Sequence, residues 1–209
     1  TGFIPRAPFN DKSSDFLWSG KAQIEYRFDE KLLLYAGINR GVKAGSYNAK
    51  VFDGTVLKDS EIPYEDEVLW AYEIGFKATV FGERAWLNGA AYFYNYKDSQ
   101  VFTRQNNSGQ VANNDATYNG FEVELLSTPM EGLDIMTGIS YTNAEVKNVI
   151  VAPNVARDVV PSFTPEWQAS ALARYSWPVM SGTMSAQLSA NYQSSFFYNL
   201  RNFDAHRLD

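Results

Sequence analysis

Charged and hydrogen-bonding side chains gather in one short stretch of this chain of 209 residues. Arg40, Lys43, Tyr47 and Asn48 lie within RGVKAGSYN (40–48), and Tyr64 follows a little further on. Cationic and phenolic side chains can contact an anionic or catecholate ligand through charge-assisted hydrogen bonds and ring stacking. These five residues are therefore candidate ligand-binding residues. The favoured alternative is that the glycines of the stretch shape the exit of a strand while the side chains are solvated.

A second set of charges is spread through segments whose residues alternate between polar and apolar. Such charges could bind a ligand, or they could form ion pairs in a wet environment, each worth about 1 kcal/mol or less. The ion-pair interpretation is the favoured one. The residues of this set are Glu73, Lys77, Glu122, Glu124 and Arg174.

Catalysis and metal binding have little support in the composition. His206 is the only histidine, and the chain contains no cysteine. A catalytic histidine or a metal site needs converging partners, which these counts do not supply. The chain carries 18 basic and 24 acidic residues without a basic cluster, which argues against a nucleic-acid partner. We therefore expect no enzyme, no metal ion and no cofactor.

The elements that must position these residues are β-strands. From Trp18 to Phe28 the side chains alternate without a break, with apolar residues on one face and Lys21, Glu25 and Arg27 on the other. Seven further segments alternate similarly, and in the segment near 85–97 either face could be the apolar one. The predicted strands cover about 18–28, 32–42, 68–81, 85–97, 117–126, 133–146, 166–177 and 184–193.

The connections between these strands alternate strictly in length. Short turns are expected near 29–31, 82–84, 127–132 and 178–182, and long loops over 43–67, 103–116 and 147–165. Transmembrane β-barrels have this asymmetry, with short periplasmic turns and long extracellular loops, whereas a Greek-key sandwich mixes its loop lengths. Only helices and closed barrels satisfy the backbone in lipid. The pattern favours an antiparallel up-and-down transmembrane β-barrel, with a soluble β-sandwich binding module as an alternative.

Several strings resemble the TonB-dependent outer-membrane receptors. RGVKAGSYN (40–48) is similar to a signature of that family, although Ser46 stands where the family often has glycine. PYEDEVLWAYEIGFK (63–77) looks like the family's next strand. Succeeding strands are matched in the family's own order by NYKDSQVF (95–102), YNGFEVEL (118–125), GLDIMTGISYTNAEV (132–146) and PEWQASALARYSW (165–177).

This resemblance implies a fold, a location and a function. The family has a 22-stranded barrel closed by a plug domain, lies in the bacterial outer membrane, and imports scarce ligands, most often ferric siderophores. We expect residues 1–209 to be part of a single transmembrane β-barrel domain, with the plug, the early strands and the final strands absent. The implied partners are outer-membrane lipid, the TonB complex through the missing N-terminal region, and an iron chelate or another scarce small molecule. The alternative is a passive porin-like or structural outer-membrane barrel.

Overall fold

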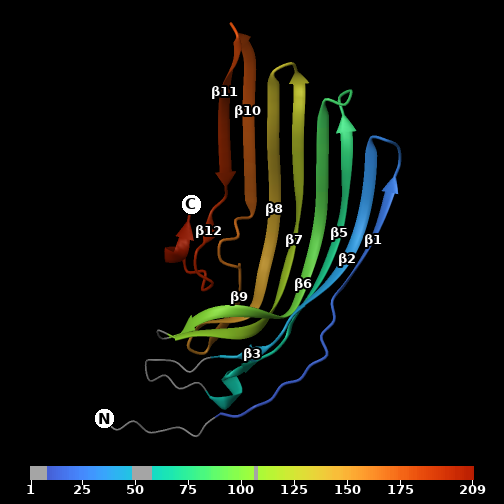
Figure 1. Cartoon of the computed structure of the whole chain (residues 1–209). Helices are drawn as coiled ribbons and strands as arrows, with labels where there is room; N and C mark the ends of the chain where they lie inside the picture. Colours follow the sequence, from blue (N-terminus) through green and yellow to red (C-terminus); the bar gives the residue numbers. More distant parts are fainter. Residues whose placement is uncertain (1–8, 49–57, 106–107) are drawn as a thin grey trace.

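Long antiparallel strands make up almost all of the computed structural model, which describes residues 9–48, 58–105 and 108–209 (Figure 1). One sheet carries its strands in the order β1-β2-β5-β6-β7-β8-β10-β11, and β9 pairs with β8 at the side of this path. The strands of this sheet are β1 (Gly20–Arg27), β2 (Leu32–Lys43), β5 (Glu67–Val80), β6 (Ala85–Gln105), β7 (Ser108–Met130), β8 (Leu133–Ala152), β9 (Val155–Val159), β10 (Trp167–Val179) and β11 (Gly182–Gln193). The eight strands predicted from alternation are therefore confirmed, in their up-and-down order.

Short elements decorate one end of the sheet. β3 (Ser46–Tyr47) pairs with β4 (Pro63–Tyr64), and β12 (Phe196–Phe197) pairs with β13 (Arg207–Leu208). The 3-10 helices η1 (Asp59–Glu61) and η2 (Asp204–His206) complete the fold. Across the described ranges, no helix has both the length and the apolar character to pass through a membrane. Ser46 does not have a positive φ, so the position tolerates a residue other than glycine.

Three expected loops differ from the structure. Residues 103–116 are not a loop, because β6 and β7 stay paired to Gln105↔Ser108. Residues 147–165 likewise contain the end of β8 and all of β9. The loop expected over 43–67 contains β3, η1 and β4, and its residues 49–57 lie outside the described ranges. Alternation fails to reveal the strand extensions because a ladder that leaves the membrane no longer needs an apolar face.

The register of the sheet separates the side chains cleanly into two faces. Ala22, Ile38, Tyr72 and Phe93 follow one another across β1, β2, β5 and β6 on the apolar face. On this face Ile24, Ile74 and Leu188 are 71%, 63% and 76% exposed, so no part of the described chain covers it. A face of exposed aliphatic side chains fits contact with lipid.

At the end of the sheet away from the hairpin turns, the strand pairs β6–β7 and β8–β9 bend over the polar face. The bends coincide with register shifts between Tyr96 and Ser99 and between Val146 and Val149. Asp98 and Asn148 adopt positive φ at these two bulges. We call the bent portions, residues 98–105 with 108–115 and residues 147–159, the arms (Figure 1). Valines of the second arm form a buried cluster against polar-face residues of the sheet: Tyr96, Ala116, Tyr118 and Val146.

Candidate functional site

Four of the five predicted ligand-binding residues lie around the small β3–β4 sheet. Lys43 ends β2 on the polar face, opposite Glu67. Tyr47 and Tyr64 lie on β3 and β4, and the Tyr47 hydroxyl donates to the Asp11 carboxylate at 3.4 Å. Desolvation first, then the charge of Asp11 and this hydrogen bond, raise the pKa of Tyr47 above its ordinary value.

Asn48 connects this small sheet to the first arm. Its side-chain oxygen accepts the Val111 N–H at 2.7 Å, and its amide nitrogen donates to the Val111 carbonyl at 2.9 Å. The same nitrogen donates to the Glu61 carbonyl at 3.1 Å. Gln100 makes a similar connection by donating to the Ala44 carbonyl at 2.8 Å. The side chain of Asn48 is thus committed to holding the arm.

Arg40 lies apart from the other four residues. It faces Gly20 on one side and Trp70 on the other, and therefore belongs to the apolar face. Its guanidinium stacks on the ring of Trp18. The sequence pattern placed it at the same rim as Lys43, but the two residues have opposite parity on one strand and point to opposite faces.

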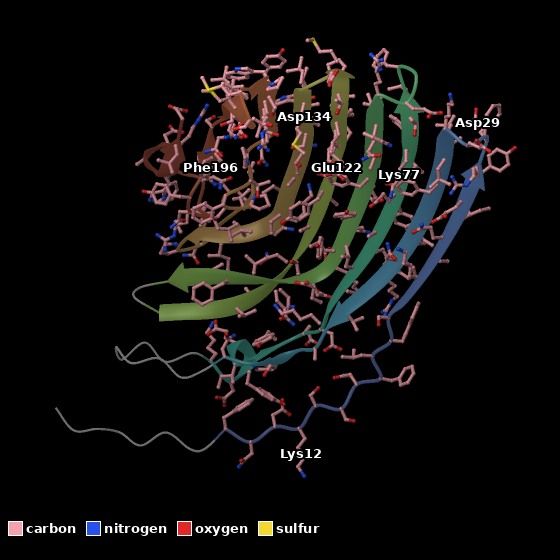
Figure 2. The ribbon with its side chains drawn as sticks, turned by 45° about the horizontal axis from the view of Figure 1, so that its top comes forward. Lys12, Asp29, Lys77, Glu122, Asp134 and Phe196 are labelled. Carbon is pink, nitrogen blue, oxygen red and sulfur yellow. The ribbon has the colours of Figure 1, made fainter. Side chains whose placement is uncertain are left out.

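The five predicted polar-face charges share one side of the sheet in the register. Glu73 of β5 and Glu122 of β7 lie on either side of β6. Lys77 of β5 and Glu124 of β7 both pair with Asn88 of β6. Arg174 of β10 lies opposite Asp134 of β8; Figure 2 shows Lys77, Glu122 and Asp134 on three separate strands. Within the described part of the chain, none of the five forms an ion pair within 4.0 Å, in contrast to the favoured expectation.

Tyrosines dominate the polar face between these charges and the arms. Tyr92, Tyr94 and Tyr96 alternate along β6, and Tyr118 of β7 lies opposite Tyr94. The rings of Tyr92 and Tyr94 stack with centroids 4.8 Å apart, and Tyr96 meets Tyr118 edge-on at 5.5 Å. We call these four residues the tyrosine row. Alternation alone does not reveal this row, because both faces of β6 contain apolar side chains; three tyrosines at spacing two were the available signal.

Glycines directly across from aromatic residues make room for this row. Tyr92 pairs with Gly120 in the register, and its hydroxyl reaches past that glycine to Thr142 of β8 at 2.7 Å. A Cβ at position 120 would lie 2.7 Å from the Tyr92 hydroxyl oxygen and would clash with the Tyr141 carbonyl. Tyr35 lies over Gly75 in the same way, and a Cβ there would be 2.5 Å from the Tyr35 ring. Aromatic rings thus cover backbone that glycine leaves open.

A cavity of about 720 Å³ lies on the arm side of the molecule, between the two arms and the C-terminal segment. Its walls include Phe102, Phe163 and Tyr198. Two polar atoms on its lining, Thr103 Oγ1 and His206 Nδ1, are buried without a hydrogen-bond partner among the described residues. The phenols, carboxylates and this cavity together offer hydrogen bonds and ring surfaces.

The comparisons with known proteins agree with this geometry. The family model described as "TonB dependent receptor-like, beta-barrel" matches residues 2–207. The ferric yersiniabactin uptake receptor FyuA from Yersinia pestis superposes with a TM-score of 0.70 at 19% identity, over 90% of this chain and 27% of that one. BauA, the ferric preacinetobactin receptor from Acinetobacter baumannii, gives 0.66 at 17% identity, over 88% and 26%.

The copper transporter OprC shares the fold as well, with a TM-score of 0.63 at 17% identity over 85% of this chain and 26% of that one. This chain spans about a quarter of the length of each of these three structures. A match over residues 2–207 excludes the soluble β-sandwich. The chain belongs to the TonB-dependent receptor-like β-barrel family, whose members are transporters, not enzymes, of the Gram-negative outer membrane.

Proposed function

We propose that this chain is part of the wall of an outer-membrane receptor that imports ferric siderophore-type chelates, with energy supplied through the TonB complex. The tyrosine row, on the polar face next to the bent arms, is the observation that carries the proposal. The remaining strands and a plug that contacts TonB would lie outside residues 1–209. Lys43, Tyr47 and Tyr64 would line the rim through which the chelate enters.

Phenol rings suit a ligand of this class for two reasons. Each ring offers an apolar face for stacking, and each hydroxyl can donate or accept a hydrogen bond. A chelate with amide, carboxylate or catecholate oxygens around its iron presents complementary groups. Of the five polar-face charges, Glu73 lies directly opposite Tyr92, and the other four lie further toward the hairpin turns: Lys77, Glu122, Glu124 and Arg174. We propose that these charges contact the plug or the ligand as it passes.

A bare metal ion is a weaker candidate for the cargo. In the described part of the chain, no group of three or more His, Cys, Asp or Glu is placed to hold a metal ion. Copper in particular prefers thiolate, thioether or imidazole ligands. The complete sequence contains no cysteine, a single histidine and four methionines. This small number of soft donors supports transport of a metal inside its chelator.

Uptake of iron-55 by cells that carry or lack the intact gene tests this proposal. A panel of catecholate, hydroxamate, phenolate and carboxylate ferric chelates should include at least one that enters only when the gene is present. Deleting TonB or adding an uncoupler should abolish that uptake. Uptake that survives both treatments would identify a passive pore, and no dependence on the gene for any chelate would refute the siderophore proposal.

A matched pair of variants locates the contact. Tyr94→Leu removes a phenol from the polar face, whereas Tyr72→Leu removes one from the apolar face of the neighbouring strand. Loss of one stacking and hydrogen-bonding ring should weaken chelate binding by about 1–2 kcal/mol, or roughly 5- to 30-fold. Tyr72→Leu should leave binding unchanged. Equal effects of the two variants would show that the tyrosine row does not contact the chelate.

A further inference from the structure

A cation on the lipid-facing side of the sheet is unexpected, and Arg40 is one. Its neighbours on the same strand and face are Ile38 and Val42. The guanidinium carbon lies 4.1 Å from the ring centroid of Trp18 and 5.8 Å from that of Trp70. One of its N–H groups donates to the Trp18 carbonyl. The two indoles, 6.0 Å apart and edge-on, therefore fix the guanidinium in one position.

The level of this cluster in the membrane follows from the topology. The short turns end the strands at one side, and Arg40 lies at the opposite end of β2, next to β3 and the arms. That end is extracellular in a barrel of this kind. Tryptophans prefer the interface between hydrocarbon and headgroups, so Trp18 and Trp70 place Arg40 at the headgroups of the outer leaflet.

A second cation shares this surface. Lys97 of β6 pairs with Val68, an apolar-face residue of β5, so its exposed side chain projects from the same face as Arg40. Two interstrand steps of about 4.8 Å and two residues of about 3.4 Å separate the two backbone positions, which gives about 12 Å. In the described ranges, neither Arg40 nor Lys97 has an ion-pair partner within 4.0 Å.

A carboxylate on this face lies near Lys97, but in the described ranges it forms no ion pair with Lys97 within 4.0 Å. This carboxylate is Asp115 of β7, which lies opposite the bulge at Lys97 and Asp98 and accepts the backbone N–H of Asp98 at 3.1 Å. Arg40 has five N–H donors, and in the described part of the chain its side chain donates one hydrogen bond, to the Trp18 carbonyl. Two cations that have no ion-pair partner in the described ranges attract an anionic lipid at headgroup level.

We propose that Trp18, Arg40, Trp70 and Lys97 form a binding site for a phosphorylated glycolipid of the outer leaflet. Arg40 binds one phosphate with its planar donors, for which guanidinium geometry is suited, and Lys97 binds a second phosphate of the same headgroup. Trp18 and Trp70 hold the guanidinium and pack against the sugar and the first acyl carbons. This site is on the outside of the wall and is independent of the transported ligand.

Lipid binding to the detergent-purified full-length receptor, measured by native mass spectrometry, tests the proposal. The probes are diphosphoryl lipid A, monophosphoryl lipid A and inorganic phosphate. The wild-type protein should bind the diphosphoryl form more tightly than the monophosphoryl form. Arg40→Gln and Lys97→Gln should each weaken diphosphoryl lipid A binding about fivefold, and together about 25-fold.

Lys21→Gln is the matched control, because Lys21 lies opposite Asn39, one residue from Arg40, and points to the polar face. Its removal should leave lipid binding unchanged. An equal loss in Lys21→Gln would show diffuse attraction in place of a site, and displacement of the lipid by inorganic phosphate would show a small-anion site. If Arg40→Gln does not fold, lipid A binding to Arg40→Lys and the comparison of the two lipids on the wild-type protein still test the proposal. A wild-type protein that binds both lipids equally would overturn the proposal.

Discussion

At the scale of single residues, the polar face depends on pairs of a tyrosine and a glycine. Tyr35 lies across from Gly75 and Tyr92 across from Gly120. In each pair a Cβ would clash with the tyrosine side chain and also with a backbone carbonyl, that of Gly89 at position 75 and that of Tyr141 at position 120. The glycine is required for this close approach and not for an unusual backbone angle, since neither has a positive φ. The tyrosine can then reach the following strand, as the Tyr92–Thr142 hydrogen bond shows.

Gly120→Ala tests this arrangement. The added methyl group should push against the Tyr141 carbonyl and displace Tyr92, breaking its hydrogen bond to Thr142. This should destabilise the barrel by about 1–3 kcal/mol, as overpacking does. The midpoint of unfolding in urea for the full-length protein in lipid vesicles measures this change. Gly41→Ala is the control, because a Cβ there meets only Leu69 at 3.9 Å and should be nearly neutral. Equal midpoints for the two variants would contradict the proposed close packing.

At the scale of elements, β-bulges turn the strand ends into arms over the polar face. A cluster of charges supports the bend of the second arm: Lys147 donates to Glu145, and to Asp158 at 3.1 Å. Asp158 also accepts the Asn148 N–H at 2.9 Å, at the residue with positive φ. The Asn148 N–H first, and Lys147 second, hold the pKa of Asp158 below its usual range. Hydrogen bonds to Glu145 and then Asp158 raise the pKa of Lys147.

These shifts predict how the order of the second arm depends on pH. The Asp158 contribution is fully present above its unfolded pKa of about 3.9 and is lost as pH falls through the lowered folded value. The Lys147 contribution is present below about 10.4 and is lost as pH rises through the raised value. Hydrogen exchange over residues 146–159, corrected for its intrinsic pH dependence, should therefore be slow from about pH 5 to 9 and faster below about 4. Asp158→Asn should remove the acid step, and a step that persists in this variant would refute the assignment.

At the scale of the whole molecule, the described sheet has two open edges. β1 and β11 end the path of strands and are each paired on one side only (Figure 1). Unpaired N–H and C=O groups cannot face hydrocarbon without a cost of several kcal/mol each. Further strands must therefore pair with β1 and β11 when the wall stands in the membrane. Aliphatic side chains such as Ile24 and Leu188 at these edges already face outward for contact with lipid.

Expression of residues 1–209 alone tests the need for these further strands. We expect the isolated segment to fail to insert into lipid vesicles as a monomer, and to run at the same position on gels whether or not it is heated. The full-length protein should shift in mobility on heating, as a closed barrel does. A heat-dependent shift for the isolated segment at monomer mass would show that these strands close on themselves and would refute the expectation.

The sequence alone determined the strands, their order and the two faces of most of them. A β-strand alternates with period two, so Trp18 to Phe28 revealed an apolar and a polar side without any knowledge of its neighbours. The alternation of short and long connections pointed to a membrane barrel, which the family match confirms. The ordered family-like strings gave the same answer from local residues.

The register decided what the strand pattern left open. β6 contains apolar residues on both sides, and only its pairing with β5 and β7 assigned Tyr92 and Tyr94 to the polar face. The polar run 103–116 carried no strand period, yet backbone hydrogen bonds to a partner kept it extended as an arm. Arg40 and Lys43 are close in sequence, but their parity on β2 sends them to opposite sides of the wall. Face and neighbour are properties of pairing between strands, so only the tertiary structure could place these residues.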